Sequence, residues 1–388
     1  MRKLSGLTSS EGDLDRQLSD FVELNRRKLT RVPYIYQRIF RTEPLEEERF
    51  FVGGEEPLRR IEESFKRFKD GFPVSAAIIA EKGNGKTTIL NRTEKSVFRG
   101  TDVVRVEFQR TFFAEIDICR QFALAFDQEP VSSFDSLERY LSELESKRVI
   151  VLENIQNTFL RTMNGFDALE KMLQMINRLG DRHYWLFTAG IYGWEYLDRT
   201  IGISGYFSDL INLPSFSDEE VRKLIEIRHE VSGYGLNYLV LPGAEKDRSY
   251  RKLNSEEQRQ NWLATMFFRK LAEHARGNIK TALMFWLSAI DTFTDEQIII
   301  DPTINLDPSF LYQLPMEEIF TLAAFAHHEF LTPSEHALVF KQSADKSLIL
   351  LRNMHKRGIL DVVEENYVIQ PFVYRAVIRG LKMKNILD

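Results

Sequence analysis

The chain has 388 residues, of which 43% are hydrophobic and 28% charged, and its net charge is −5. This length predicts two or three domains, the apolar fraction excludes a disordered chain, and the mildly acidic average argues against a protein that coats nucleic acid over its whole surface. No long uncharged apolar run is present, and the single cysteine, Cys119, excludes an intramolecular disulfide, so the sequence predicts no membrane span and favours a reducing cytoplasm.

The first segment, residues 1–45, is predicted to be a basic and aromatic arm. Its stretch 24–42 contains no acid and six positive side chains, which are Arg26, Arg27, Lys28, Arg31, Arg38 and Arg41. Three aromatic side chains are interleaved with these charges. Two interpretations stay open: a solvated helix docked by its aromatic residues, or an arm in which Arg26, Arg27 and Lys28 contact phosphates or a partner.

Residues 46–215 alternate short apolar runs with amphipathic segments such as 167–179. The runs predicted as buried strands are Val74–Ala80, Val103–Phe108, Val149–Leu152, Tyr184–Thr188 and Leu210–Leu213. Strands that alternate with helices indicate an α/β domain with a mainly parallel sheet.

Residues 216–300 are predicted to form a helical domain, because the strand signals fade after Ser217. Ser217 and Glu220 have the spacing of a capping box at a helix start. The predicted helices are Asp218–His229, Asn261–Ala275 and Ile279–Thr292, interrupted by a polar stretch at 243–257 that includes a loop.

A proline-containing linker, residues 301–315, leads to a third unit at 316–388. Its predicted elements are helices at 316–328, 332–340 and 347–357 and strands at 359–363 and 367–370. Three helices followed by a β-hairpin is the order of a winged helix.

Positive charge collects at this end of the chain. Residues 341–388 hold nine Lys or Arg and five acids, a balance of +4. Arg352, Lys356 and Arg357 fall on the predicted recognition helix, so double-stranded DNA is one candidate partner. The predicted wing tip, Glu364 and Glu365, is acidic and would repel phosphate, so docking of a protein partner stays open.

The most informative residues follow the first predicted strand. Residues 80–88 read AEKGNGKTT, which matches the P-loop pattern G-x-x-x-x-G-K-[ST] except for Ala80. Small residues let backbone N–H groups surround phosphates at the start of the next helix. The predicted nucleotide-binding residues here are Gly83, Asn84, Gly85, Lys86, Thr87 and Thr88. Lys86 would reach the β- and γ-phosphates, and Thr87 would bind Mg²⁺.

A second half of the site is predicted at the end of the strand 149–152. Glu153 follows this strand, at the sheet edge where ligands sit in such folds, and would hold Mg²⁺. Asn154 occupies the place where many ATPases carry a glutamate that activates water, and an amide cannot accept that proton. Thr188, at the end of the next strand, could orient water or contact the γ-phosphate.

With these motifs the sequence resembles the AAA+ ATPases, particularly the branch of the origin-recognition/Cdc6 proteins and the related signal-transducing STAND ATPases. Residues 51–58 (FVGGEEPL) are similar to the family's motif F-V-G-R-E-x-x-L, with Gly54 in place of arginine. Residues 277–280 (GNIK) are similar to the start of its sensor-2 helix, G-N-x-R, with Lys280 in place of arginine.

The resemblance implies an ATP (or ADP) and Mg²⁺ site between the α/β domain and a helical lid, followed by a C-terminal winged helix. It implies that Val52 lies near the adenine and that Lys280 senses the γ-phosphate. It also implies a homo-oligomeric ring or filament, in which an arginine from a neighbouring subunit completes the site; Arg199 is the candidate.

Ala80, Glu153, Asn154 and Lys280 all depart from the family pattern in ways that weaken hydrolysis more than binding. We therefore expect a slow ATPase that acts as a nucleotide-gated switch on DNA or a DNA-bound partner, as in replication initiation or transposition. The alternative is a STAND-type signalling or anti-phage ATPase that acts through protein partners. A P-loop scaffold without turnover is a third possibility. Three histidines, His327, His328 and His336, lack a companion acid or cysteine cluster and are expected to pack in the interior or lie at the surface.

Overall fold

The computed structural model describes residues 11–43, 47–304 and 306–387. These residues divide into two compact units. The P-loop unit holds residues 47–216 and 323–344, and the helical unit holds residues 11–43, 217–322 and 345–387.

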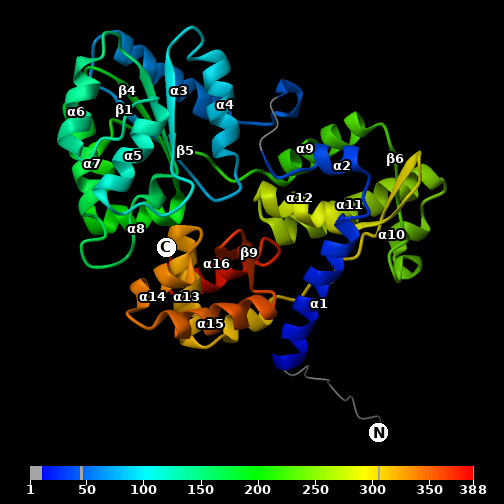
Figure 1. Ribbon diagram of the computed structural model, residues 1–388. Helices are drawn as coiled ribbons and strands as arrows, with labels where there is room; N and C mark the ends of the chain where they lie inside the picture. The colour runs from blue at the N-terminus through cyan, green and yellow to red at the C-terminus, as the bar shows by residue number, and fades with distance from the viewer. Residues whose placement is uncertain (1–10, 44–46, 305, 388) are drawn as a thin grey trace. The chain divides into compact units, whose positions relative to one another are not determined.

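A five-stranded sheet is the centre of the P-loop unit (Figure 1). Its strands are β1 (Ser75–Ala80), β2 (Val103–Glu107), β3 (Val149–Glu153), β4 (Tyr184–Gly190) and β5 (Asp209–Asn212). Their order is β2-β3-β4-β1-β5, and every neighbouring pair is parallel. The predicted strands and the predicted parallel sheet are therefore confirmed, and all carboxyl ends of the strands meet at one edge.

Helices cover both faces of this sheet (Figure 1), as a parallel sheet requires. One core joins Ala76 and Ile78 of β1 to α3 (Glu55–Lys69) and α4 (Lys86–Ser96). Alternate residues of β1, Ala77 and Ile79, face the other core. The helices of that second core are α5 (Glu115–Ala125), α6 (Phe134–Glu143), α7 (Asp167–Arg178) and α8 (Ile191–Ile201). Cys119 is fully buried there, as a small hydrophobic residue.

The helical unit contains the predicted helices and a small sheet. Its helices before the C-terminal region are α1 (Glu11–Leu29), α2 (Tyr34–Ile39), α9 (Asp218–Ser232), α10 (Arg248–Arg251), α11 (Glu256–Ala275) and α12 (Ile279–Ser288). The capping box of Ser217 and Glu220 at the start of α9 is confirmed, since both of its hydrogen bonds are present.

Two expectations for this unit are wrong. The last predicted helix ends at Ser288 rather than Thr292, and three strands follow or precede it: β6 (Gly235–Tyr238), β7 (Ile290–Phe293) and β8 (Gln297–Ile300), in the order β6-β8-β7. Each strand has only four residues, and β6 pairs with β8 from a distant part of the chain. Strands this short form through tertiary pairing, and their sequence pattern is too brief to predict.

The N-terminal segment docks on this unit through its aromatic residues. Tyr36 and Phe40 are fully buried. The Tyr36 hydroxyl accepts a hydrogen bond from Trp286 Nε1 at 2.9 Å and lies 3.1 Å from His229 Nδ1. Arg228 donates to the backbone carbonyls of Ile39 and Arg41. These contacts fit the docked-helix interpretation of the segment.

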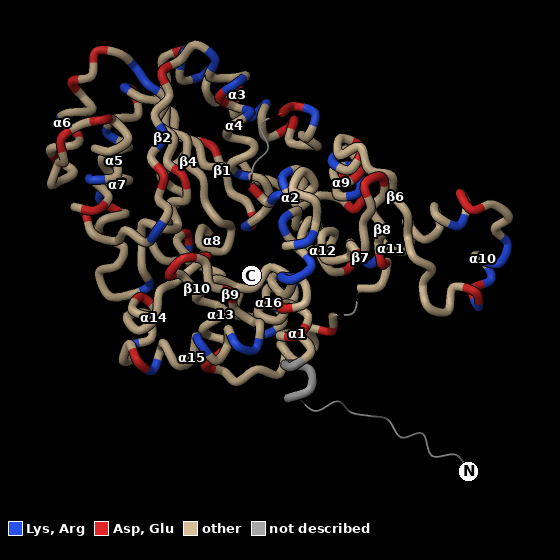
Figure 2. The backbone as a smooth tube through the Cα atoms, turned by 45° about the vertical axis from the view of Figure 1, so that its right-hand side comes forward, with Lys and Arg blue, Asp and Glu red and all other residues tan. Residues whose placement is uncertain are grey.

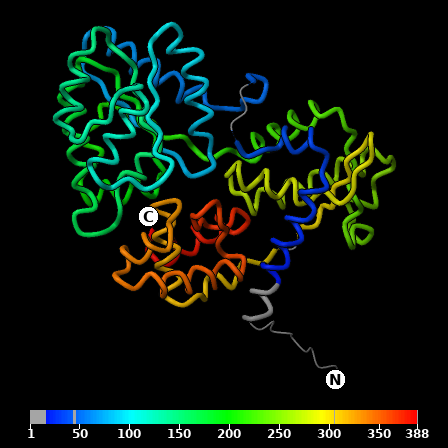
Figure 3. The backbone as a smooth tube through the Cα atoms, in the orientation of Figure 1, coloured from blue at the N-terminus to red at the C-terminus, as the bar shows by residue number. Residues whose placement is uncertain are grey.

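The C-terminal elements follow the predicted order of a winged helix (Figure 3). They are α13 (Met316–His328), α14 (Pro333–Phe340), α15 (Ala344–Lys356), β9 (Leu360–Val363) and β10 (Asn366–Ile369). Strands β9 and β10 are antiparallel. A further helix, α16 (Tyr374–Met383), was not predicted. Among the residues described, no helix is long and apolar enough to cross a membrane.

Candidate nucleotide-binding site

The P-loop connects β1 to α4, as predicted. Gly83 and Gly85 both have positive φ, +85° and +83°, which glycine adopts without strain. Ala80 ends β1 without a positive φ, so its methyl group fits where the pattern has glycine. Lys86 begins α4 with a side chain only 10% exposed, and its Nζ lies 3.4 Å from the Ala80 carbonyl oxygen. The loop therefore curls back over the sheet edge at the N-terminus of a helix.

Other P-loop side chains are also held inward. Asn84 is 3% exposed, and its Oδ1 has no hydrogen-bond partner within the described residues. The buried Glu81 carboxylate accepts a hydrogen bond from the Tyr192 hydroxyl at 3.1 Å. Thr87 and Thr88 lie in the first turn of α4, partly buried. The loop thus presents one buried amide oxygen and two hydroxyl groups near the helix start.

Polar side chains of β3 and β4 lie at the same sheet edge. Thr188 pairs in register with Ile78 of β1, and its Oγ1 accepts a hydrogen bond from the Asn154 backbone N–H at 3.0 Å. Asn154 has a φ of +61°, a conformation that asparagine tolerates better than most residues. Glu153 is 4% exposed at the end of β3. The structure therefore brings Glu153, Asn154 and Thr188 together, at the edge where the P-loop also lies.

Glu153 is paired with an arginine that the sequence analysis did not single out. Arg105, on β2, donates to Glu153 Oε1 at 3.1 Å and to Asn91 Oδ1 at 2.8 Å, and it also pairs with Glu94. Burial raises the pKa of the Glu153 carboxyl, against the lowering effect of the Arg105 charge. One arginine thus ties the acid of β3 to the P-loop helix α4.

The motif ahead of the sheet packs on the same helix. Gly54 is the N-cap of α3 with a φ of +82°, and a Cβ there would lie 2.6 Å from Ile89 Cδ1 of α4. The Arg92 guanidinium lies 5.4 Å from the centre of the Phe51 ring. Val52, the predicted adenine neighbour, is partly buried in this loop. The left-handed backbone at this position therefore gives the glycine in place of the family's arginine a conformational reason.

The remaining predicted residues lie elsewhere. Arg199 is exposed in the last turn of α8, and its Nε donates a hydrogen bond to the Glu195 backbone carbonyl. Lys280 lies in the first turn of α12, which Asn278 caps, in the helical unit. Lys280 and the P-loop therefore belong to different units.

The predicted nucleic-acid residues differ in what they contact. Arg26 pairs with Asp361, Arg27 with Glu23 one helical turn away, and Arg357 with Glu318 at 2.7 Å. Lys28 is partly buried, whereas Arg352 and Lys356 on α15 are exposed. Figure 2 marks the Lys and Arg positions along the chain in blue. Three of the six predicted side chains therefore form ion pairs with acids of the same chain.

Sequence reasoning missed several residues at the sheet edge. They are Lys82, Arg105, Gln156, Gly190 and Glu329. Gln156 is buried; its Oε1 accepts from the Gly190 N–H, and its Nε2 has no hydrogen-bond partner in the described part of the chain. A charged residue inside the apolar strand 103–107 was a usable signal for Arg105. No sequence signal links Glu329 to residues about 245 positions earlier.

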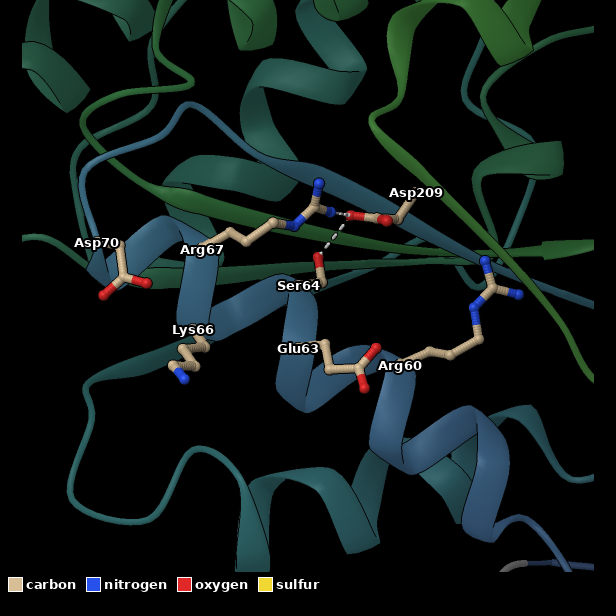
Figure 4. A pocket seen from close by; sticks show the side chains of 7 residues that line it. All are labelled: Arg60, Glu63, Ser64, Lys66, Arg67, Asp70 and Asp209. Carbon is tan, nitrogen blue, oxygen red and sulfur yellow. Dashed lines mark hydrogen bonds and ion pairs between the residues drawn. The ribbon is translucent and has the colours of Figure 1, made fainter.

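A shallow polar pocket also lies on the P-loop unit, between α3 and the edge strand β5 (Figure 4). Its lining residues are Arg60, Glu63, Ser64, Lys66, Arg67, Asp70 and Asp209. Asp209 pairs with Arg67 and accepts a hydrogen bond from Ser64 at 2.9 Å. With three cations and three acids, the pocket offers no excess positive charge to a phosphate.

Among known proteins, the chain is similar to solved structures only. No protein-family profile and no curated protein matches the chain. It is similar to the ORC1 protein of Aeropyrum pernix, solved in complex with DNA, at 14% identity and a TM-score of 0.44 over 90% of this chain and 97% of that one. It is also similar to Cdc6p of Pyrobaculum aerophilum, at 14% identity and a TM-score of 0.42 over 90% and 98%. The RuvB Holliday junction branch migration motor of Thermotoga maritima aligns at 13% identity and a TM-score of 0.36 over 88% and 98%.

Two of these neighbours carry the origin-recognition and Cdc6 names, and the third is a RuvB motor. At these identities and TM-scores the likeness is weak, and the strand order and the P-loop carry the assignment of fold. A five-stranded parallel sheet with a P-loop after β1 and an acid at the end of β3 is an α/β P-loop fold, as predicted.

Proposed function

We propose that this protein is an ATP-binding switch with slow hydrolysis. The observation that carries the proposal is the contrast at the sheet edge. The P-loop has its glycines in the required conformation and Lys86 buried at the start of α4, whereas Asn154 stands in the place of a catalytic acid. Such a site binds a nucleotide well and activates water poorly.

Binding rests on the P-loop. Its backbone N–H groups and the positive end of α4 favour the phosphates, and Lys86 adds a full charge. Thr87 and Glu153 fit Mg²⁺, because this ion needs only one or two protein oxygens besides the phosphates and water. Arg105 occupies one oxygen of the Glu153 carboxylate and leaves the second for the ion or its water. When bound, Mg²⁺ would neutralise charge on the phosphates.

Slow hydrolysis rests on the residues after β3. The side-chain amide of Asn154 cannot take a proton from water. The Asn154 backbone N–H already donates a hydrogen bond to the Thr188 hydroxyl. We propose that Lys280 and an Arg199 from a neighbouring copy complete the site in an ATP-dependent homo-oligomer. Binding of ATP, rather than its hydrolysis, would then set the state of the switch. The single buried cysteine fits a cytoplasmic setting.

DNA, or a DNA-bound partner, is the proposed target. Arg352 and Lys356 are exposed on α15, the helix in the recognition position, where they are available to phosphates. The alternative is a signalling or defence switch that docks a protein through the same region. The acidic wing residues Glu364 and Glu365, both exposed, favour that alternative.

Nucleotide binding is tested with Lys86→Ala and the matched exposed control Lys66→Ala. Titration of a fluorescent ATP analogue with MgCl₂ should give binding by the wild type and the control and none by Lys86→Ala. Equal affinity of all three proteins would refute the site. Single-turnover hydrolysis is expected far below about 10 s⁻¹, the typical enzyme value, and a rate near it would refute the slow switch.

The two targets are separated by salt dependence. If DNA is the target, duplex affinity should require ATP, fall steeply between low and physiological salt, and drop for the pair Arg352→Ala and Lys356→Ala. The exposed pair Arg251→Ala and Lys252→Ala is the control. Absence of DNA binding at micromolar protein favours the protein-docking alternative.

A further inference from the structure

The turn after α13 places a carboxylate on the two P-loop lysines. Lys82 Nζ donates a hydrogen bond to the Glu329 backbone carbonyl at 2.9 Å and lies 3.8 Å from Oε2 of that side chain. Lys86 Nζ lies 3.7 Å from Glu329 Oε1. All three residues belong to the P-loop unit. The Lys86 side chain is 10% exposed, that of Glu329 15% and that of Lys82 30%, so the Lys86 and Glu329 charges meet away from bulk water.

Two glycines make room for this turn. A Cβ at Gly190 would lie 2.5 Å from Glu329 Oε1, and a Cβ at Gly193 would lie 2.7 Å from the His327 carbonyl oxygen. The backbone conformation requires glycine at neither position, since Gly190 has a φ of −71° and Gly193 lies inside the helix α8. Residues 327–329 therefore approach both glycines closely, and at Gly193 the Gln156 Cβ, at 2.8 Å, also excludes a side chain.

The turn is also anchored on both sides. The His327 ring stacks on Tyr196 with 4.6 Å between ring centres, and the His328 ring lies 4.7 Å from that of Phe159. Glu329 itself has a φ of +62°, which costs about 1 kcal/mol for a residue with a side chain. A strained glutamate held by its neighbours, with its carboxylate on functional lysines, points to a role in the site.

We propose that Glu329 is a built-in competitor for the phosphates of the nucleotide. Its carboxylate neutralises Lys82 and Lys86, the cations that a nucleoside triphosphate would otherwise meet. The inference rests on the proposed nucleotide function. ATP binds only by displacing the carboxylate, and the polyphosphate succeeds because it brings more negative charge and the backbone N–H groups of the loop.

This competition also couples the nucleotide to a larger part of the chain. Glu329 follows directly on α13, whose first residues, up to Leu322, belong to the helical unit. Release of Glu329 frees the end of one continuous helix. The segment 323–344 is therefore the part of the P-loop unit whose packing changes when ATP binds.

The experiment compares the full-length wild type with Glu329→Gln, which keeps the size of the side chain and removes its charge. Titration with a fluorescent ATP analogue and MgCl₂ should show about tenfold tighter binding by Glu329→Gln. Glu145→Gln, the same change at an exposed carboxylate of the same unit, should bind as the wild type does. Hydrogen exchange of the wild type should rise in residues 323–344 when ATP is added.

The outcomes separate the competitor from the nucleotide function. Equal affinity of Glu329→Gln and the wild type, with binding abolished by Lys86→Ala, overturns the competitor and leaves the function standing. Unchanged exchange in residues 323–344 at saturating ATP also overturns it. Absence of nucleotide binding by both the wild type and Glu329→Gln overturns the proposed function and the competitor together.

Discussion

The two halves of the candidate site are built differently although they share one sheet edge. The phosphate-binding half, after β1, keeps its glycines at positive φ and a buried Lys86. The acidic half, after β3, has Glu153 paired with Arg105 and an amide, Asn154, beside it. A P-loop depends on backbone conformation and tolerates few changes, whereas the acidic half depends on side chains that can be exchanged without altering the fold. Binding and hydrolysis can therefore be separated within one scaffold.

Among the changes that test this contrast, removal of Arg105 from the acidic half should have the largest effect. Arg105→Met leaves the Glu153 carboxylate, 5% exposed, without its counter-charge, and we expect a loss of about 3 kcal/mol in the free energy of unfolding. Urea denaturation measures this free energy. The control is Arg99→Met, the same change at an exposed arginine. The added change Glu153→Gln should recover part of the loss; no recovery would show that the ion pair is not the cause.

Restoring an acid should sharpen the contrast next. Asn154→Glu places a potential general base after β3, and we expect the single-turnover rate of ATP hydrolysis to rise about 100-fold. Asn154→Gln has the same length and the same backbone strain but no base, so its rate should stay at the wild-type value. Equal rates for the two variants would mean that hydrolysis is limited elsewhere in the site.

Acid should weaken the segment that covers the phosphate-binding half. Burial, together with the charges of Arg161 and Arg199, lowers the pKa of His327 to about 3. Below about pH 6.5 His327 is protonated in the unfolded chain but stays neutral in the folded chain. The free energy of unfolding therefore falls as the pH drops towards 3. From pH 7 to 5 this histidine should cost about 2 kcal/mol.

The measurement for this prediction is urea denaturation of the wild type and His327→Gln at pH 7 and pH 5. The variant should lose less stability than the wild type over that interval. His328, whose pKa is also lowered by burial, keeps part of the dependence in both proteins. An identical loss in both proteins would contradict the assignment to His327.

Packing around the P-loop helix gives the smallest expected effect. Gly54→Ala places a methyl group against Ile89, whereas Gly71→Ala, also at positive φ, meets nothing within 4 Å. Both variants are strained by left-handed backbone, and Gly54→Ala should lose about 1 kcal/mol more in the free energy of unfolding because of the contact. Equal losses would show that Ile89 moves aside without cost.

The sequence determined the parts of this protein that depend on local pattern. Five strands, the P-loop at residues 80–88, the capping box at Ser217 and the position of Glu153 were all predicted, because apolar runs, glycine spacing and capping residues act within a few positions of the chain. The helix 316–328 was predicted to the residue for the same reason.

Tertiary structure alone decided the rest. The sheet β6-β8-β7 forms from four-residue strands that only distant pairing stabilises. The ion pair of Arg105 with Glu153, and the placement of Glu329 on Lys82 and Lys86, join residues about 50 to 250 positions apart. Such contacts follow from which faces of helices and strands meet in the folded chain, and local periodicity carries no information about that meeting. The sequence therefore predicted the candidate phosphate site, and the fold determined what else reaches it.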